Sequence, residues 1–227
     1  MANNFDKNWT TVNNNYPLND KEVERYISVK PSSNQLALVD KPFYTFMHFG
    51  MNTATDREWG AGVEKATDFT IKSINAKQWV ETAKSAGATG VILTCKHHDG
   101  FCLWPSEYTS FCVKNSSYKG DIVKEVSDEC HKQGMDFGVY LSPWDMHDER
   151  YGTDAYNDYF CNQLTELLTN YGEIFEVWFD GAKGSNAKKF EYDWQRYYDL
   201  IRKLQPKANI AICGPDIRWV GNEGGKS

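Results

Sequence analysis

The chain has 227 residues, of which 41% are hydrophobic and 15% aromatic, which is enough for a large buried core and excludes an intrinsically disordered chain. Its 25 basic and 31 acidic residues give a net charge of −6 without a cluster of Lys or Arg, so nucleic acid and anionic membrane surfaces are poor partners. No apolar run approaches the ~20 residues of a membrane-spanning helix.

A polar N-terminal arm, residues 1–40, precedes the repeating part of the chain. Its first segment, Met1–Asp20, is rich in Asn and lacks the apolar core of a signal peptide, which favours a cytoplasmic location. The six cysteines are dispersed and include no CxxC pair. Because a chain of this size does not need a disulfide framework, we expect mostly buried free thiols.

From residue 41 onward, strand-like and helical patterns alternate along the chain. The runs predicted to form strands are Phe43–Phe49, Gly90–Cys95, Phe137–Leu141, Ile174–Phe179 and Ile210–Cys213. Apolar residues at helical spacing predict helices over Trp79–Ala83, Ile122–Cys130, Tyr156–Tyr171 and Trp194–Leu204. Gly87, Gly134 and Gly172 stand where three of these helices should end, and Pro206 ends the last.

The predicted strands are mostly apolar, as is typical of parallel strands that are buried on both faces. Each of them delivers polar or titratable groups at its carboxyl end: His48, Lys96–Gly100, Tyr140–Asp145, Asp180 and Asp216. In a barrel these ends converge on one mouth, whereas in an open doubly wound sheet they spread along a line. The pattern therefore favours an α/β protein with a (β/α)8 barrel.

The length of the chain conflicts with a complete barrel. A (β/α)8 barrel takes ~250 residues, whereas residues 41–227 carry only about five βα units. We therefore expect residues 41–227 to be a partial barrel catalytic domain that is truncated at its C-terminus. No glycine-rich nucleotide-binding motif follows the first predicted strand, which argues against a nucleotide cofactor.

Two carboxylates on successive βα loops indicate a possible site for glycoside cleavage. Asp180 ends the strand predicted over residues 174–179, and Glu223 lies in a glycine-rich loop. Glycosidases use such a pair, in which one carboxylate attacks or activates water and the other protonates the leaving oxygen. By spacing alone the signal is weak, because an Asp before Gly often caps a turn and a loop acid is often solvated.

The adjacent residues His97 and His98 admit two interpretations. One is a metal site, but neighbouring residues of an extended segment point to opposite faces and cannot share an ion without a kink. The other is hydrogen bonding of neutral imidazoles to sugar hydroxyls, in which His48 could take part. His131 and His147 are expected on the surface and receive no role.

Several longer motifs together resemble glycoside hydrolase family 29, the α-L-fucosidases. They are HFGMNT at 48–53, REWG at 57–60, KHHDGFCLWP at 96–105, GVYLSPWD at 138–145, EVWFDG at 176–181 and GPDIRWVGNE at 214–223. The resemblance covers roughly residues 41 to 223. Three of these stretches are most similar to the subfamily that acts on α-1,3 and α-1,4 linkages in branched, Lewis-type glycans.

The resemblance implies a retaining mechanism with a covalent fucosyl-enzyme intermediate. It makes Asp180 the nucleophile and Glu223 the acid/base. The residues it assigns to substrate binding are His48, Glu58, Trp59, His97, His98, Tyr140 and Trp178. Arg218 and Trp219, beside the acid/base, are candidates to contact the neighbouring sugars, with loop packing as the alternative.

The expected partner is a fucosylated glycan, and the mechanism requires neither a cofactor nor a metal. Two rival functions remain on the sequence. A fucose-binding module without chemistry would lack one of the two carboxylates, and both are present. A metal-dependent hydrolase would be built on the three histidines near the strand ends together with Asp180. The sequence does not indicate the oligomeric state.

Overall fold

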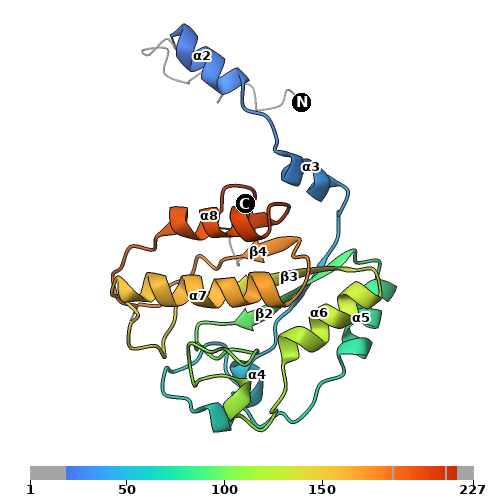
Figure 1. Ribbon diagram of the computed structural model, residues 1–227, viewed down its shortest axis with the longest axis vertical. Helices are drawn as coiled ribbons and strands as arrows, with labels where there is room; N and C mark the ends of the chain where they lie inside the picture. Colours follow the sequence, from blue (N-terminus) through green and yellow to red (C-terminus); the bar gives the residue numbers. More distant parts are fainter. Residues whose placement is uncertain (1–18, 186, 213, 219–227) are drawn as a thin grey trace, which may run out of the picture. The chain divides into compact units, whose positions relative to one another are not determined.

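The computed structural model describes residues 19–185, 187–212 and 214–218 (Figure 1). The chain divides into two compact units, Met1–Ser32 and Ser33–Ser227. The described part of the first unit contains helix α2, Asp20–Ile27, which begins with a capping box. There Asn19 accepts a hydrogen bond from the Glu22 amide, and the Glu22 carboxylate accepts one from the Asn19 amide. None of the described helices is both long and apolar enough to span a bilayer.

The second unit is built on a five-stranded sheet. Its strands are β1 (Thr45–Met47), β2 (Gly90–Lys96), β3 (Asp136–Leu141), β4 (Glu176–Trp178) and β5 (Asn209–Ala211). All neighbours are parallel, and the order in the sheet is the order in the chain. A doubly wound sheet reverses direction at a switch point, so a sheet wound in chain order has the topology of a (β/α) barrel.

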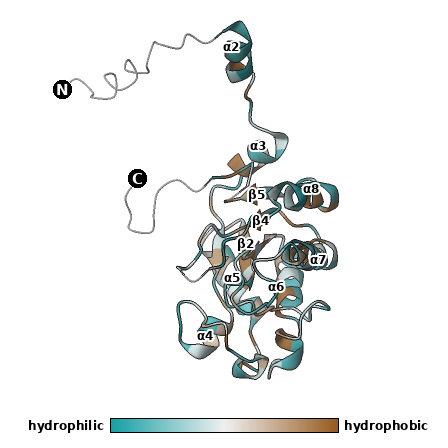
Figure 2. Ribbon diagram, turned by 90° about the vertical axis from the view of Figure 1, so that its left-hand side faces the viewer, coloured by the Kyte–Doolittle hydropathy of each residue, from teal (hydrophilic) through white to brown (hydrophobic). Residues whose placement is uncertain are grey.

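One helix of this unit precedes the first strand, two follow it, and one follows each of the next three strands. They are α3 (Ser33–Val39), α4 (Met51–Thr55), α5 (Ala76–Ser85), α6 (Ile122–Lys132), α7 (Ala155–Asn170) and α8 (Trp194–Leu204). Helices α6, α7 and α8 lie on the same side of the strands (Figures 1 and 2). The predicted helix ends at Gly87, Gly134 and Gly172 are confirmed, since all three glycines have positive φ.

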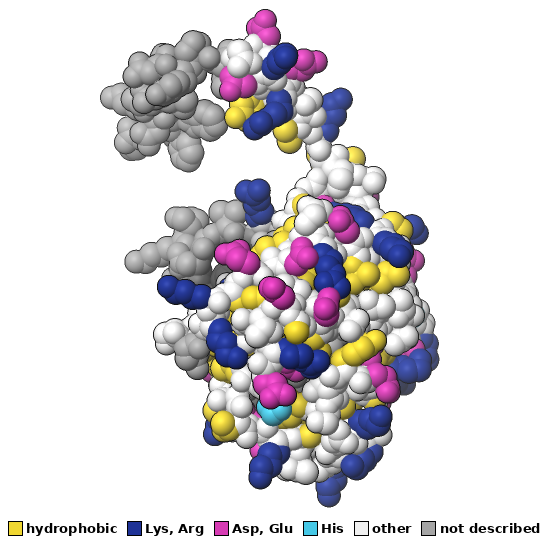
Figure 3. Space-filling view, turned by 60° about the vertical axis from the view of Figure 1, so that its left-hand side comes forward, with side chains coloured by type: hydrophobic (Ala, Val, Ile, Leu, Met, Phe, Trp, Pro, Cys, Tyr) yellow, Lys and Arg dark blue, Asp and Glu magenta, His cyan; other side chains and the backbone are white. Residues whose placement is uncertain are grey.

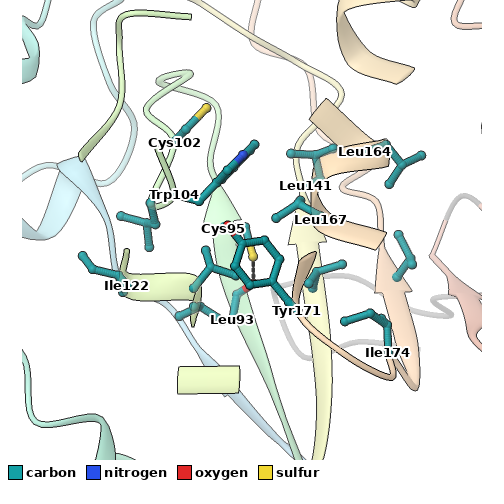
Figure 4. Close-up of a cluster of buried hydrophobic side chains, with 14 of the residues drawn as sticks. Leu93, Cys95, Cys102, Trp104, Ile122, Leu141, Leu164, Leu167, Tyr171 and Ile174 are labelled. Carbon is teal, nitrogen blue, oxygen red and sulfur yellow. Dashed lines mark hydrogen bonds between the residues drawn. The ribbon is translucent and has the colours of Figure 1, made fainter. Parts of the chain in front are cut away.

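The main hydrophobic core lies between these helices and the sheet (Figure 4). Helix α6 shows how the sequence produces it. Asp121 caps the helix by accepting a hydrogen bond from the Lys124 amide, and Ile122, Val126 and Cys130 then recur on one buried face. Five cysteines in the described ranges are buried free thiols, as predicted, and Cys213 lies outside those ranges.

The opposite face of the sheet carries a second, smaller cluster, made of Ile92, Tyr140 and Phe175 with Trp178 packed against it. In a closed barrel this face lines the interior. On the face shown in Figure 3, basic and acidic side chains are interspersed. That distribution agrees with the absence of a basic cluster in the sequence.

The observed strands β1, β4 and β5 are shorter than predicted. At the end of β1 the amide of Phe49 donates to the side-chain hydroxyl of Thr94, at 3.0 Å, and no longer to the backbone of β2. The chain has therefore left the sheet before the apolar run ends. The prediction of strand β2 was one residue short, since the strand reaches Lys96.

Candidate active site

A cavity of about 820 Å³ opens at the carboxyl ends of the strands. The predicted site residues that line it are His48, Glu58, Trp59, His97, His98, Trp178 and Asp180. They come from the ends of β1, β2 and β4 and from the loop after β1. The cavity thus collects predicted residues from positions up to 132 apart in the chain, from His48 to Asp180, as the barrel topology predicts.

Both oxygens of Asp180 are held by hydrogen bonds. Tyr140 donates its hydroxyl to Oδ2 at 2.8 Å, and the Ala182 amide donates to Oδ1 at 2.6 Å. Burial and the charge of Asp180 raise the pKa of Tyr140 well above its usual value, so the phenol remains a donor. Tyr140 itself is buried behind the carboxylate and does not line the cavity. The Asp180 side chain is 24% exposed, which leaves the carboxylate accessible from the cavity.

His98 is fixed by a chain of two hydrogen bonds. The hydroxyl of Ser142 donates to the carbonyl of Trp144 at 2.7 Å, so it accepts from Nδ1 of His98, also at 2.7 Å. Burial lowers the pKa of His98 to about 4, although the charge of Asp180 opposes the shift. At neutral pH the lone pair is therefore on Nε2, which lies 3.9 Å from Oδ2 of Asp180. A hydroxyl group of a bound molecule can donate to this pair of acceptors.

His97 lies beside His98, with 4.2 Å between the ring centroids. Its Nδ1 is 3.2 Å from the side-chain nitrogen of Asn52. Burial is the main cause that lowers the pKa of His97 to about 2, and the neighbouring His98 and His48 add to the shift. Burial also lowers the pKa of His48. All three imidazoles are therefore neutral near pH 7 and suited to polar contacts with an uncharged ligand.

His97 and His98 do not lie on an extended segment, so the alternation that would place them on opposite faces does not apply. Strand β2 ends at Lys96, and the next residues form a turn that is closed by a hydrogen bond from the Gly100 amide to the His97 carbonyl at 3.0 Å. Gly100 has a φ of 86°, a conformation that favours glycine. This turn is the kink that brings both rings to one side.

Trp59 forms an open wall of the cavity. Its side chain is 46% exposed, and its ring meets His98 and Trp144 edge-on, at centroid distances of 5.9 and 5.6 Å. An exposed aromatic face of this kind can stack on the C–H face of a sugar. Glu58 is exposed at the rim.

The loop that carries Trp59 packs closely on the histidine turn. A Cβ atom at Gly60 would lie 2.6 Å from the Cβ of Asp99, so only glycine fits there. Asp99 is buried, accepts from the Phe101 amide at 2.7 Å and from Asn52 at 3.2 Å, and has its pKa raised by burial to about 7. Asp99 thus supports the turn from beneath and does not line the cavity.

Besides Tyr140, three more predicted site residues are not placed in the cavity. Arg218 is described, is exposed and does not line it. Trp219 and Glu223 lie outside the described residues. Their roles therefore remain predictions.

Comparison with known proteins decides the family. The sequence profile of the family named alpha-L-fucosidase matches residues 55–222. This chain belongs to the α-L-fucosidase family. It is 51% identical over 200 residues to alpha-L-fucosidase 1 of Arabidopsis thaliana, an alignment that covers 86% of this chain and 40% of the plant protein. The chain thus spans about two fifths of the length of that relative.

Solved structures agree with the family. A glycoside hydrolase family 29 member from an unknown rumen bacterium is similar with a TM-score of 0.82 and 48% identity, covering 86% of this chain and 38% of that one. A Ruminococcus gnavus fucosidase of the same family, solved in complex with fucose, has a TM-score of 0.73 and 40% identity over 78% of this chain and 41% of its own. The predicted fold class is confirmed: the similar structures have a (β/α)8 catalytic domain, and this chain shares its fold over five parallel strands.

Sequence reasoning missed several residues that line the cavity of this fucosidase-family chain. They are Phe46, Asn52, Thr53, Asp56, Arg57, Ala182 and Ile212. A signal for Phe46 was present, because it precedes His48 by two residues and so shares its side of strand β1. Its ring packs edge-on against Tyr140 and Trp178, at 5.6 and 5.3 Å. Phe46 therefore supplies apolar surface to the cavity next to Trp178.

Proposed function

We propose that the protein hydrolyses terminal α-L-fucose from glycans. The observation that carries the proposal is the fixed Asp180 carboxylate, held by Tyr140 and Ala182 at a cavity that also contains three neutral histidines. Membership of the α-L-fucosidase family and similarity to a fucosidase solved with fucose support it.

The proposed reaction is retaining. Glu223, protonated, donates its proton to the glycosidic oxygen while Asp180, ionised, attacks the anomeric carbon from the opposite face. The aglycone leaves as an alcohol, and an ester bond joins fucose to Asp180. Glu223, now a carboxylate, takes a proton from water, which attacks the anomeric carbon and releases fucose with its original configuration. The histidines contact the sugar hydroxyls, and Phe46 and Trp178 offer apolar surface.

We further propose a preference for α-1,3 and α-1,4 linkages in branched, Lewis-type glycans. The stretches that support it are those most similar to this subfamily, Asn52–Thr53, Arg57–Gly60 and Asp216–Glu223. Arg218 and Trp219 would then contact the sugar next to the cleaved bond, because they precede the acid/base that touches the leaving oxygen.

The test is release of fucose from a Lewis-type trisaccharide compared with an α-1,2-linked trisaccharide. We expect release from the first and much slower release from the second, with the α anomer as the first product seen by NMR. Asp180→Asn, which keeps the shape of the side chain, should still bind fucose but should not release it from a glycan. No release from any fucoside by the purified protein would contradict the proposal, and fucose binding alone would indicate a binding module.

A further inference from the structure

His97, His98 and Asp180 form a cluster of potential metal ligands. One ring nitrogen of each histidine and one carboxylate oxygen lie within 4.8 Å of one another. Among the residues that the structure describes, no other group of three ligand side chains is as close. All three side chains line the cavity, so an ion could reach them from solvent.

The set of donor atoms suits zinc. Open zinc sites have three protein ligands, often two imidazoles and a carboxylate, and keep a fourth position for water or a small molecule. With bonds of about 2.0–2.1 Å, a tetrahedral ion holds its donors about 3.3 Å apart. His98 Nε2 and Asp180 Oδ2 are already 3.9 Å apart, so small side-chain movements would complete the site.

Two of the three ligands, His98 and Asp180, have a partner that holds them in a form able to bind an ion. Ser142 accepts from Nδ1 of His98, which leaves Nε2 with its lone pair toward Asp180. Tyr140 donates to the Asp180 oxygen that faces His98. Such outer partners fix ligand geometry in metal sites and strengthen binding. The Asn52 side-chain nitrogen donates to Nδ1 of His97, so His97 carries its proton on Nε2 and has to shift that proton before it can bind an ion.

We propose that this cluster is an inhibitory site for zinc or a similar divalent transition-metal ion. The ion would occupy the position of the sugar hydroxyls and engage Asp180, so metal and sugar exclude each other. Inhibition rests on the proposed function, whereas metal binding itself does not. The ion is not a cofactor in this proposal, because it would engage the carboxylate that attacks the sugar.

Binding is tested with Co²⁺, whose visible absorption reports tetrahedral coordination by nitrogen and oxygen. We expect one equivalent to bind to the purified protein. His98→Asn should weaken binding at least tenfold, and Ser142→Ala should weaken it less. His131→Asn, which removes an exposed histidine of α6 far from the cluster in sequence, is the matched control and should leave binding unchanged. Circular dichroism establishes that each variant is folded.

Two results would overturn the proposed site: absence of saturable Co²⁺ binding to the unmodified protein, or equal binding by folded His98→Asn. L-Fucose should displace Co²⁺ from the unmodified protein, a test that needs no variant. In the activity assay, Zn²⁺ should raise the apparent KM without changing kcat, and a chelator should restore the original rate. Loss of activity on chelation would overturn the inhibitory role. Metal binding that depends on His98, in a protein without fucosidase activity, would contradict only the proposed function.

Discussion

Both carboxylate oxygens of Asp180 are held by hydrogen bonds at the cavity. The effect of removing this carboxylate tests its proposed role as the nucleophile. Because Asp180 is the carboxylate that attacks the sugar in the proposed reaction, Asp180→Ala should lower turnover of natural and activated fucosides alike, by at least about a thousandfold. Glu223→Ala should abolish cleavage of the natural glycan but preserve the first step on an aryl fucoside, whose leaving group needs little protonation. Burst kinetics should then show accumulation of the fucosyl-enzyme.

Added azide distinguishes the two roles. In Glu223→Ala it needs no general base and should yield fucosyl azide of retained configuration. In Asp180→Ala it would attack from the side that the carboxylate vacated and should yield the inverted product. The opposite pattern of products, read by NMR, would show that the two roles are exchanged.

Glu176 is a buried carboxylic acid in β4, two residues before Trp178 and on the same face. Neither carboxylate oxygen makes a hydrogen bond of ordinary geometry. Burial raises the pKa of Glu176 from 4.5 to about 7, although Tyr44 nearby lowers it somewhat. The folded state therefore binds this proton more tightly than the unfolded state between pH 4.5 and 7, and the free energy of unfolding falls as the pH rises through that window.

Glu176→Gln removes this titration. The free energy of unfolding of the variant, minus that of the unmodified protein, should rise by up to ~3 kcal/mol as the pH increases from 4.5 to 7. Above pH 7 this difference should change little. Urea unfolding of both proteins across this range measures it. Other groups titrate in both proteins and cancel in the difference. A difference in stability that does not vary with pH would contradict the shifted pKa.

At the scale of the elements, the order and type of helices and strands were predictable from the sequence, because apolar spacing and the three helix-ending glycines are local signals. The residues at which the strands end were not predictable in this way. Where the chain leaves the sheet depends on cross-strand partners, such as the contact of Phe49 with Thr94. The shared orientation of His97 and His98 has the same origin, since it depends on a turn that the residue alternation does not reveal.

One buried ion pair connects the end of β2, just before the two cavity histidines, to the loop after β3. Lys96, at the end of β2, lies 3.0 Å from Asp145, which follows β3, and both side chains are almost completely buried. Lys96 also contacts Gln163 of α7 at 3.0 Å, and Asp145 accepts from the His147 and Asp148 amides. The pair therefore joins the strand before the two histidines to the neighbouring loop.

Lys96→Met should destabilise the protein by about 3–5 kcal/mol, because it leaves the Asp145 charge buried without its partner. The double variant Lys96→Met/Asp145→Asn should recover part of the loss. Lys77→Met is the matched control: it breaks the exposed Lys77–Glu81 pair, so the free energy of unfolding should change by less than about 1 kcal/mol. Equal effects of Lys96→Met and Lys77→Met in urea unfolding would show that the buried pair is not structural.

At the scale of the whole molecule, the described sheet has two edges, formed by β1 and β5. Beside β1 lies a largely apolar groove of about 430 Å³, whose walls include Met47 and Phe49 from β1 and its end and Trp79 and Ala83 from α5. Unpaired parallel edges and exposed apolar surface both favour association of chains. In a closed barrel, a further βα unit would cover this region.

We therefore expect the chain of 227 residues to self-associate through the β1 groove when it is purified alone. Met47→Lys places a charge that would be desolvated in such a contact, and it should shift the protein toward monomer at equal concentration. Val63→Lys is the matched control, because Val63 is 77% exposed and does not line the groove. Sedimentation velocity at several concentrations measures association, and thermal unfolding establishes that both variants are folded. A monodisperse monomer of the unmodified chain, or equal effects of the two substitutions, would show that the groove is not the contact surface.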